Sequence, residues 1–111
     1  MSRRHIQLMN GILGPGGTDS YVVPAGYKVL LSSVVVSAET VSPVHALWSL
    51  TLNPAAGGPR FIIDELTEAD PFLGEPWTVL EFNDVVQIEN ESGGGGPNIE
   101  YSLSGIRYDL P

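Results

Sequence analysis

Few side chains in this chain can move a proton at neutral pH: it has two histidines, His5 and His45, and no cysteine. An imidazole acting as a general base needs a nucleophile and an orienting acid within hydrogen-bond reach. Ser49 and Asp64 supply those residue types, but no strand–turn–helix motif exposes the serine. His5 lies within the first residues of the chain, where a catalytic group is hard to hold rigidly. We therefore expect no catalytic residue and no enzymatic activity.

Carboxylates could recruit a hard cation or form an acid–base pair. Four acids gather between Asp64 and Asp70, but without the D-x-[DN]-x-[DN]-G spacing of a calcium loop. Two histidines far apart in the sequence, with no thiolate, make a weak case for zinc. Neighbouring acids such as Glu81 and Asp84 would suit glycoside hydrolysis only in a concave, aromatic-lined site, which nothing here indicates. We expect a solvated acidic loop, with no metal and no cofactor.

Two glycine-rich segments, residues 14–17 and 93–96, resemble phosphate-binding loops in composition. Neither is followed by Lys-Ser/Thr or opens a helix, so we expect turns instead, with a long flexible hairpin loop over residues 90–98. Trp48 alternates in phase with the apolar residues of its run, which is typical of a core residue. Trp77 follows a Glu-Pro pair and is typical of a rim or interface. Stacking of either indole on a sugar is the alternative.

Charge is divided unevenly along the chain. Residues 1–60 carry four Lys or Arg against two acids, whereas residues 61–111 carry eleven acids and Arg107 alone. Such a chain repels phosphate, so we expect no direct binding to nucleic acid. No apolar run reaches the ~20 residues of a membrane span and no secretory signal follows Met1, so we expect no membrane partner. An acidic body with a short basic N-terminal arm at residues 1–5 favours pairing with copies of itself or with a basic surface.

Apolar residues alternate in short runs separated by Gly, Pro, Asn and Asp, which is typical of β-strands. We expect strands at residues 5–13, 21–23, 27–38, 46–52, 60–63, 77–82, 85–89 and 99–108. The apolar parity changes at Gly105, where a β-bulge would restore the register for Ile106 and Tyr108. Residues 64–71 are compatible with a single helical turn. About eight short strands in one domain spanning residues 1–111 predict an all-β protein, a single antiparallel β-sandwich of jelly-roll-like form.

The segment from Tyr21 to Val36, YVVPAGYKVLLSSVVV, contains a strand–turn–strand of the form YxVPAGY, then Lys and an apolar Ser/Val-rich run. It resembles the opening of small β-sandwich virion proteins of tailed bacteriophages. Residues 46–54 and 80–88 are similar to later segments of that family, with Asn83 where Gly is usual. Asn tolerates positive φ better than most residues do. The family has no active-site residues to transfer, and the resemblance implies a subunit of a capsid decoration, head-fibre or tail component, often trimeric.

From this resemblance we expect a non-enzymatic structural protein located in the virion, with capsid decoration as the leading function. A tail or head–tail junction component, such as a fibre or tip knob, is the first alternative, and a carbohydrate-binding module is the second. The expected partners are further copies of the chain, with a trimer favoured, and the major capsid protein or another virion protein. The residues expected at these interfaces are Arg3, Arg4, His5, Ile6, Phe72 and Trp77.

Overall fold

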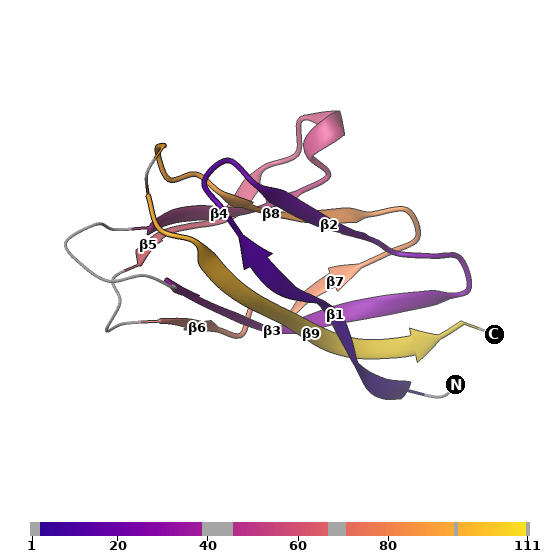
Figure 1. Cartoon of the computed structure of the whole chain (residues 1–111). Coiled ribbons are helices and arrows are strands. Elements are labelled where there is room, and N and C mark those ends of the chain that lie inside the picture. Colours follow the sequence, from indigo (N-terminus) through magenta and orange to yellow (C-terminus); the bar gives the residue numbers. More distant parts are fainter. Residues whose placement is uncertain (1–2, 39–45, 67–70, 95, 111) are drawn as a thin grey trace.

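The computed structural model describes residues 3–38, 46–66, 71–94 and 96–110, with the backbone alone at residues 61 and 63–66. Strands make up most of these ranges (Figure 1). The elements are β1 (Arg3–Leu13), β2 (Thr18–Val22), β3 (Tyr27–Ala38), β4 (Ala46–Leu52), the short 3-10 turn η1 (Pro54–Ala56), β5 (Arg60–Leu66), β6 (Phe72–Gly74), β7 (Thr78–Leu80), β8 (Val85–Asn90) and β9 (Ile99–Asp109). Within the described part of the chain, no helix is long and apolar enough to span a bilayer.

The strands form two antiparallel sheets that pack face to face (Figure 1). Sheet A has the order β1-β9-β3-β6, with β7 also paired to β3, and sheet B has the order β2-β8-β4-β5. Because β6 and β7 pair with different parts of β3, they act as one edge strand that Pro76 interrupts, since proline has no N–H to donate. Counted in this way, the sandwich has eight strand positions in jelly-roll order. The predicted all-β, antiparallel, jelly-roll-like sandwich is confirmed.

The core lies between the two sheets and contains the side chains on their inner faces. Trp48 of β4 is fully buried near its centre, with its ring edge-to-face against Phe72 of β6 at 5.0 Å between centroids. Such aromatic pairs add to the free energy of apolar burial. The other core side chains are Met9, Val23, Val29, Leu31, Val34, Val36, Ala46, Leu50, Leu80, Val86, Ile88, Ile99, Tyr101 and Leu103. Trp48 is thus a core residue, as its phase predicts, and is not available to stack on a sugar.

The bulge predicted at Gly105 lies instead on the two neighbouring strands. The β9 strand is regular there, while Leu8 of β1 and Ser32 of β3 are each the extra residue in their ladders. Gly105 lies on the inner face, where a Cβ would lie 2.6 Å from the carbonyl oxygen of Leu30, so a residue with a side chain does not fit there. Ile106 and the other even-numbered residues of β9 therefore lie on the outer face of sheet A, which makes the predicted position of the bulge wrong.

Two tyrosine hydroxyls link the sheets where β2 crosses over sheet A. The Tyr101 hydroxyl of β9 donates to Oδ2 of Asp19 on β2 at 2.5 Å. The hydroxyls of Tyr21 on β2 and Tyr27 on β3 lie 3.2 Å apart. Burial is the largest cause that raises the pKa of both Tyr21 and Tyr101 above the ordinary 10.0, and hydrogen bonding to Tyr27 and Asp19 respectively adds to it. Both hydroxyls are therefore held in their neutral, hydrogen-bonded form at neutral pH.

Three expected segments differ in the structure. The basic arm expected at residues 1–5 is, from Arg3 onward, the first part of β1, because Arg3 to His5 pair with β9. The helical turn expected from residue 64 is wrong in its first part, since β5 continues to Leu66; residues 67–70 lie outside the described ranges. The glycine-rich loop is anchored at Asn90, whose side-chain Nδ2 donates to the carbonyl oxygens of Leu13 and Pro97, both at 3.0 Å.

Candidate interaction surface

The side chains offered for chemistry are not brought together among the described residues. His5 is exposed on β1 in sheet A, whereas Ser49 is buried on β4 in sheet B. Asp64 pairs through its backbone with Trp48, and His45 lies outside the described ranges. Within those ranges, no group of three or more His, Asp or Glu is placed to hold a metal ion. The surface features that need an explanation are therefore apolar and ionic.

The residues predicted for interfaces occupy both edges of sheet A. Arg3, Arg4, His5 and Ile6 all belong to β1, and the first three are exposed. Phe72 is half-buried because its ring turns inward against Trp48. Trp77 lies between β6 and β7 with a left-handed backbone (φ 49°) and leaves 55% of its surface exposed. These positions do not test the predicted interface. They do show that Phe72 faces inward, whereas Trp77 faces outward.

Apolar side chains gather on the outer face of sheet A near its β6–β7 edge. The ladders place His5 beside Ile106, Ile106 beside Leu30, and Leu30 beside Val79, so these four form one row across four strands. A second pair on this face, Val35 and Leu73, lies farther along β3. Leu73 is 72% exposed and Val79 is 55% exposed. We call this surface the outer patch, and it comprises Leu30, Val35, Leu73, Val79 and Ile106.

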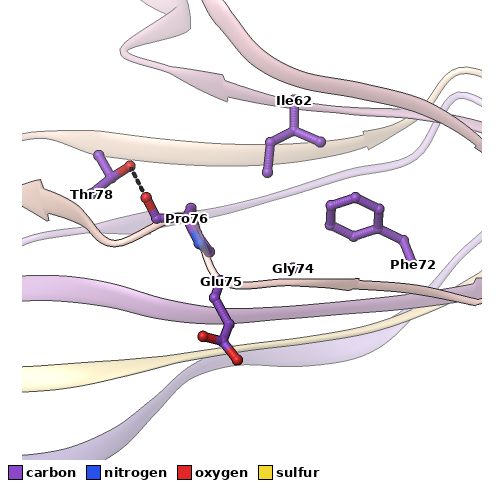
Figure 2. A pocket seen from close by; sticks show the side chains of 6 residues that line it. All are labelled: Ile62, Phe72, Gly74, Glu75, Pro76 and Thr78. Carbon is purple, nitrogen blue, oxygen red and sulfur yellow. Dashed lines mark hydrogen bonds between the residues drawn. The ribbon is translucent and has the colours of Figure 1, made fainter.

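The hollows that open on the described surface include the following three. One, of about 430 Å³, lies at the open seam between the sheets, where Ile62 of β5 faces Phe72 of β6 and the Glu75 side chain points away from both (Figure 2). An apolar hollow of about 220 Å³ lies beside η1 and Asn83. The third, of about 350 Å³, lies on the outer face of sheet A between β1 and β9, with Ile12 and Glu100 in its wall. None of the three gathers the convergent polar groups of a built active site.

The basic side chains divide into paired and unpaired. Lys28 pairs with Glu81 at 3.3 Å, and Arg107 pairs with Asp109 at 2.8 Å while its guanidinium stacks 4.0 Å over the Tyr27 ring. Arg3 and Arg4 of β1, by contrast, form no salt bridge with any described residue. Unpaired charge at a strand edge either keeps that edge soluble or meets a partner of opposite charge.

The salt bridge between Arg60 of β5 and Glu91 crosses a whole strand. Its two atoms lie 3.0 Å apart, although β4 separates β5 from β8 in sheet B. The register places Arg60 opposite Thr51, and the Glu91 amide donates to the carbonyl oxygen of Leu47. On β4, Ser49 lies between Leu47 and Thr51, so the ion pair passes over it. Ser49 is 1% exposed although it lies on the outer face of sheet B.

Sequence reasoning missed Leu73, Val79 and Ile106 as surface residues. Alternation alone does not say which face of a strand is buried. An apolar residue in a predicted strand is therefore normally assigned to the core face. The available signal was Pro76, which is incompatible with a central strand and marks the neighbouring Leu73 and Val79 as edge residues. Nothing comparable marks Ile106.

Comparisons with known proteins give little. No family model and no curated protein matches this chain. Among solved structures, the chain is similar to the Drosophila NLP core, a structure described by its pentamer formation and histone binding. The likeness has 11% sequence identity and a TM-score of 0.48, and covers 94% of this chain and 98% of that one. At these values it carries no argument about what the present chain binds.

The expectation of a phage virion protein is corrected by this comparison. The solved structure found is described by pentamer formation and histone binding, and not by the expected capsid-decoration function, the tail or carbohydrate-binding alternatives, the favoured trimer or the major capsid protein as partner. We withdraw these expectations and put no function of the Drosophila protein in their place. The resemblance of residues 21–36 to phage proteins, and a location in a virion, stay predictions that these observations do not test.

Proposed function

We propose that this chain is a non-catalytic structural subunit that associates with copies of itself through the outer patch. The observation that carries the proposal is the concentration of exposed apolar side chains on one face of sheet A, with Leu73 and Val79 both more than half exposed. Monomeric proteins rarely expose contiguous apolar patches larger than roughly a few hundred Å², and larger patches mark interaction sites. The dispersal of His5, Ser49 and the other candidate catalytic side chains supports a role without chemistry.

The charges around the outer patch support a second copy as the partner. Arg3 lies in the row next to that of Ile106 and Leu30, at the far side of the Lys28–Glu81 salt bridge, while Glu75 lies between the two short edge strands. Both signs are therefore present at the border of one surface. An identical surface related by a two-fold axis can place each sign against its opposite, which is the requirement for a self-complementary interface.

The experiment is sedimentation velocity of the purified chain over a range of protein concentrations. We expect a reversible assembly that dissociates on dilution, and we expect Leu73→Ser combined with Val79→Ser to remove the part of the association that the outer patch makes, so that the assembly is smaller than that of the unmodified chain. These two side chains are already exposed, so the change leaves the core and the circular dichroism spectrum unaltered.

The matched control is Val22→Ser combined with Leu47→Ser, which removes two exposed apolar side chains from sheet B. We expect this variant to associate like the unmodified chain. Equal loss of assembly in both double variants would mean that general surface hydrophobicity drives association. A chain that is monomeric at every concentration would overturn the proposed function.

A further inference from the structure

The free edge of β1 is the longest unpaired edge in the described part of the sandwich. This strand has eleven residues and is bonded to β9 alone, so its other side carries backbone N–H and C=O groups without a strand partner. Proteins usually protect such edges with short strands, prolines, β-bulges, charged side chains or covering loops. The opposite edge of sheet A is protected in this way, since β6 and β7 have three residues each and Pro76 lies between them.

We propose that β1 pairs antiparallel with β1 of a second copy, joining two copies of sheet A into one continuous sheet. The contact is distinct from the outer patch, because it uses the strand edge instead of the face. It leaves the outer patches of both copies on the same side of the joined sheet, where they are still free to act.

The bulge at Leu8 sets the register of this pairing. Before the bulge, Arg3, His5 and Gln7 lie on the outer face; after it, Asn10 and Ile12 do. A two-fold axis between Gln7 and Leu8 places outer residues opposite outer residues, with Arg3 of one copy opposite Ile12 of the other. The bulged residue Leu8 then lies next to the two-fold axis. Each copy contributes two regular stretches, residues 3–6 on one side of the axis and residues 9–12 on the other.

Charge complementarity identifies the occupant as a second copy. Glu100 of β9 is exposed, has no salt bridge with any described residue, and pairs across the ladder with Ile12 on the outer face. In the proposed register, Arg3 of the second copy lies one strand beyond Ile12 and thus two strands from Glu100. Two-fold symmetry makes this contact twice, once at each end of the joined strands. Arg3 of each copy is thus matched with Glu100 of the other. Such attraction between opposite charges offsets the repulsion between two acidic copies.

An arginine and a glutamate can meet across an intervening strand in this fold. Two strand spacings are about 10 Å, and the Arg60–Glu91 pair covers the same number of spacings over β4, with 3.0 Å between its atoms. In the β1 pairing, the stem of Arg3 lies over Ile12, which is 57% exposed in the single chain. Covering that side chain adds apolar burial to the ionic contact.

The test uses the Leu73→Ser, Val79→Ser background, in which association through the outer patch is removed and β1 pairing is the contact left. We expect this background to form a dimer in sedimentation equilibrium. Arg3→Glu and Glu100→Arg, each added alone, place like charges together at both ends of the pairing. Each should raise the dimer dissociation constant about tenfold or more. Glu89→Arg is the charge-matched control on sheet B and should leave the constant unchanged.

Mixing the two charge variants is the decisive measurement. A copy with Arg3→Glu and a copy with Glu100→Arg match at both ends when they pair with each other, although each repels itself. An equimolar mixture should therefore regain the dimer of the background, as heterodimers. Variants that stay monomeric when mixed, despite a background that dimerises, would overturn the proposed register and its charge pairing.

Cross-linking gives a readout that does not depend on charge, because the chain has no native cysteine. A His5→Cys copy mixed with an Asn10→Cys copy should form a disulfide heterodimer on oxidation, since these positions lie opposite each other in the proposed ladder. Asn10→Cys mixed with Thr18→Cys on β2 should not. Absence of the first cross-link would count against the pairing.

The outcomes separate this inference from the proposed function. If the unmodified chain associates and the background does not, the outer patch accounts for assembly and the β1 pairing is wrong. If the outer-patch changes have no effect while the charge variants dissociate the assembly, the β1 pairing holds and the proposed role of the outer patch is wrong.

Discussion

At Gly105, the absence of a side chain permits two strands to approach closely. A Cβ atom there would lie 2.6 Å from the carbonyl oxygen of Leu30 and 3.0 Å from Cγ1 of Val29. Both neighbours belong to β3, and the carbonyl oxygen is part of the backbone, so it moves only if the β3–β9 ladder moves. The β3–β9 ladder that includes this close approach places Ile106 on the outer face, beside Leu30.

Replacing this glycine should therefore strain the ladder. We expect Gly105→Ala to lower the free energy of unfolding by about 1–3 kcal/mol, because a methyl group is forced into packed backbone. Urea denaturation followed by circular dichroism measures it. Gly93→Ala is the control, since a Cβ there meets nothing within 4 Å, and it should change stability by no more than about 0.5 kcal/mol. Equal effects of the two changes would contradict the steric argument.

At the scale of elements, one buried side chain fixes two connections of the sandwich, the β1–β2 turn and the glycine-rich connection between β8 and β9. Asn90 at the end of β8 is fully buried, and its Oδ1 accepts a hydrogen bond from the amide of Ser92 at 3.0 Å. Its Nδ2 donates to the carbonyl oxygens of Leu13, the last residue of β1, and of Pro97, which lies in the connection between β8 and β9. One asparagine thus joins the β1–β2 turn to the glycine-rich connection between β8 and β9. Glycine content alone would indicate a free loop.

Asn90→Asp tests this clamp with almost no change in size. A carboxylate cannot donate to the carbonyl oxygens of Leu13 and Pro97, so both would lose their partner inside the protein. We expect the free energy of unfolding to fall by about 2–4 kcal/mol, from the lost buried hydrogen bonds and the buried charge. Hydrogen exchange at residues 91–98 should accelerate. Asn10→Asp, at an exposed position of β1, should leave both measurements unchanged.

At the scale of the whole molecule, β2 contributes two side-chain to side-chain hydrogen bonds that join one sheet to the other. Tyr21 and Asp19 of β2 belong to sheet B, while their partners Tyr27 and Tyr101 belong to sheet A. Both links depend on a neutral hydroxyl, and burial raises the pKa of Tyr21 and Tyr101 above the ordinary 10.0. The packing of one sheet on the other is therefore linked to proton binding at high pH.

Stability should fall at alkaline pH. Because the pKa of each tyrosine is raised on folding, its contribution is fully present below about pH 10 and is lost as the pH rises further, where the unfolded chain releases the proton first. We expect the free energy of unfolding to decline above pH 10 more steeply for the unmodified chain than for Tyr21→Phe combined with Tyr101→Phe. Urea denaturation at a series of pH values measures the two slopes. Identical slopes would show that other groups cause the decline.

The sequence by itself determined the fold class, most strand positions and the burial of Trp48, because alternation and turn residues are local signals. It did not determine the faces of Ile106 and Phe72, the division of the last sheet A edge into β6 and β7, or the anchoring role of Asn90. These features depend on contacts between residues far apart in the chain, such as Gly105 against Leu30. Alternation assigns side chains to two faces, but only the register against neighbouring strands and the packing of the second sheet decide which face is buried.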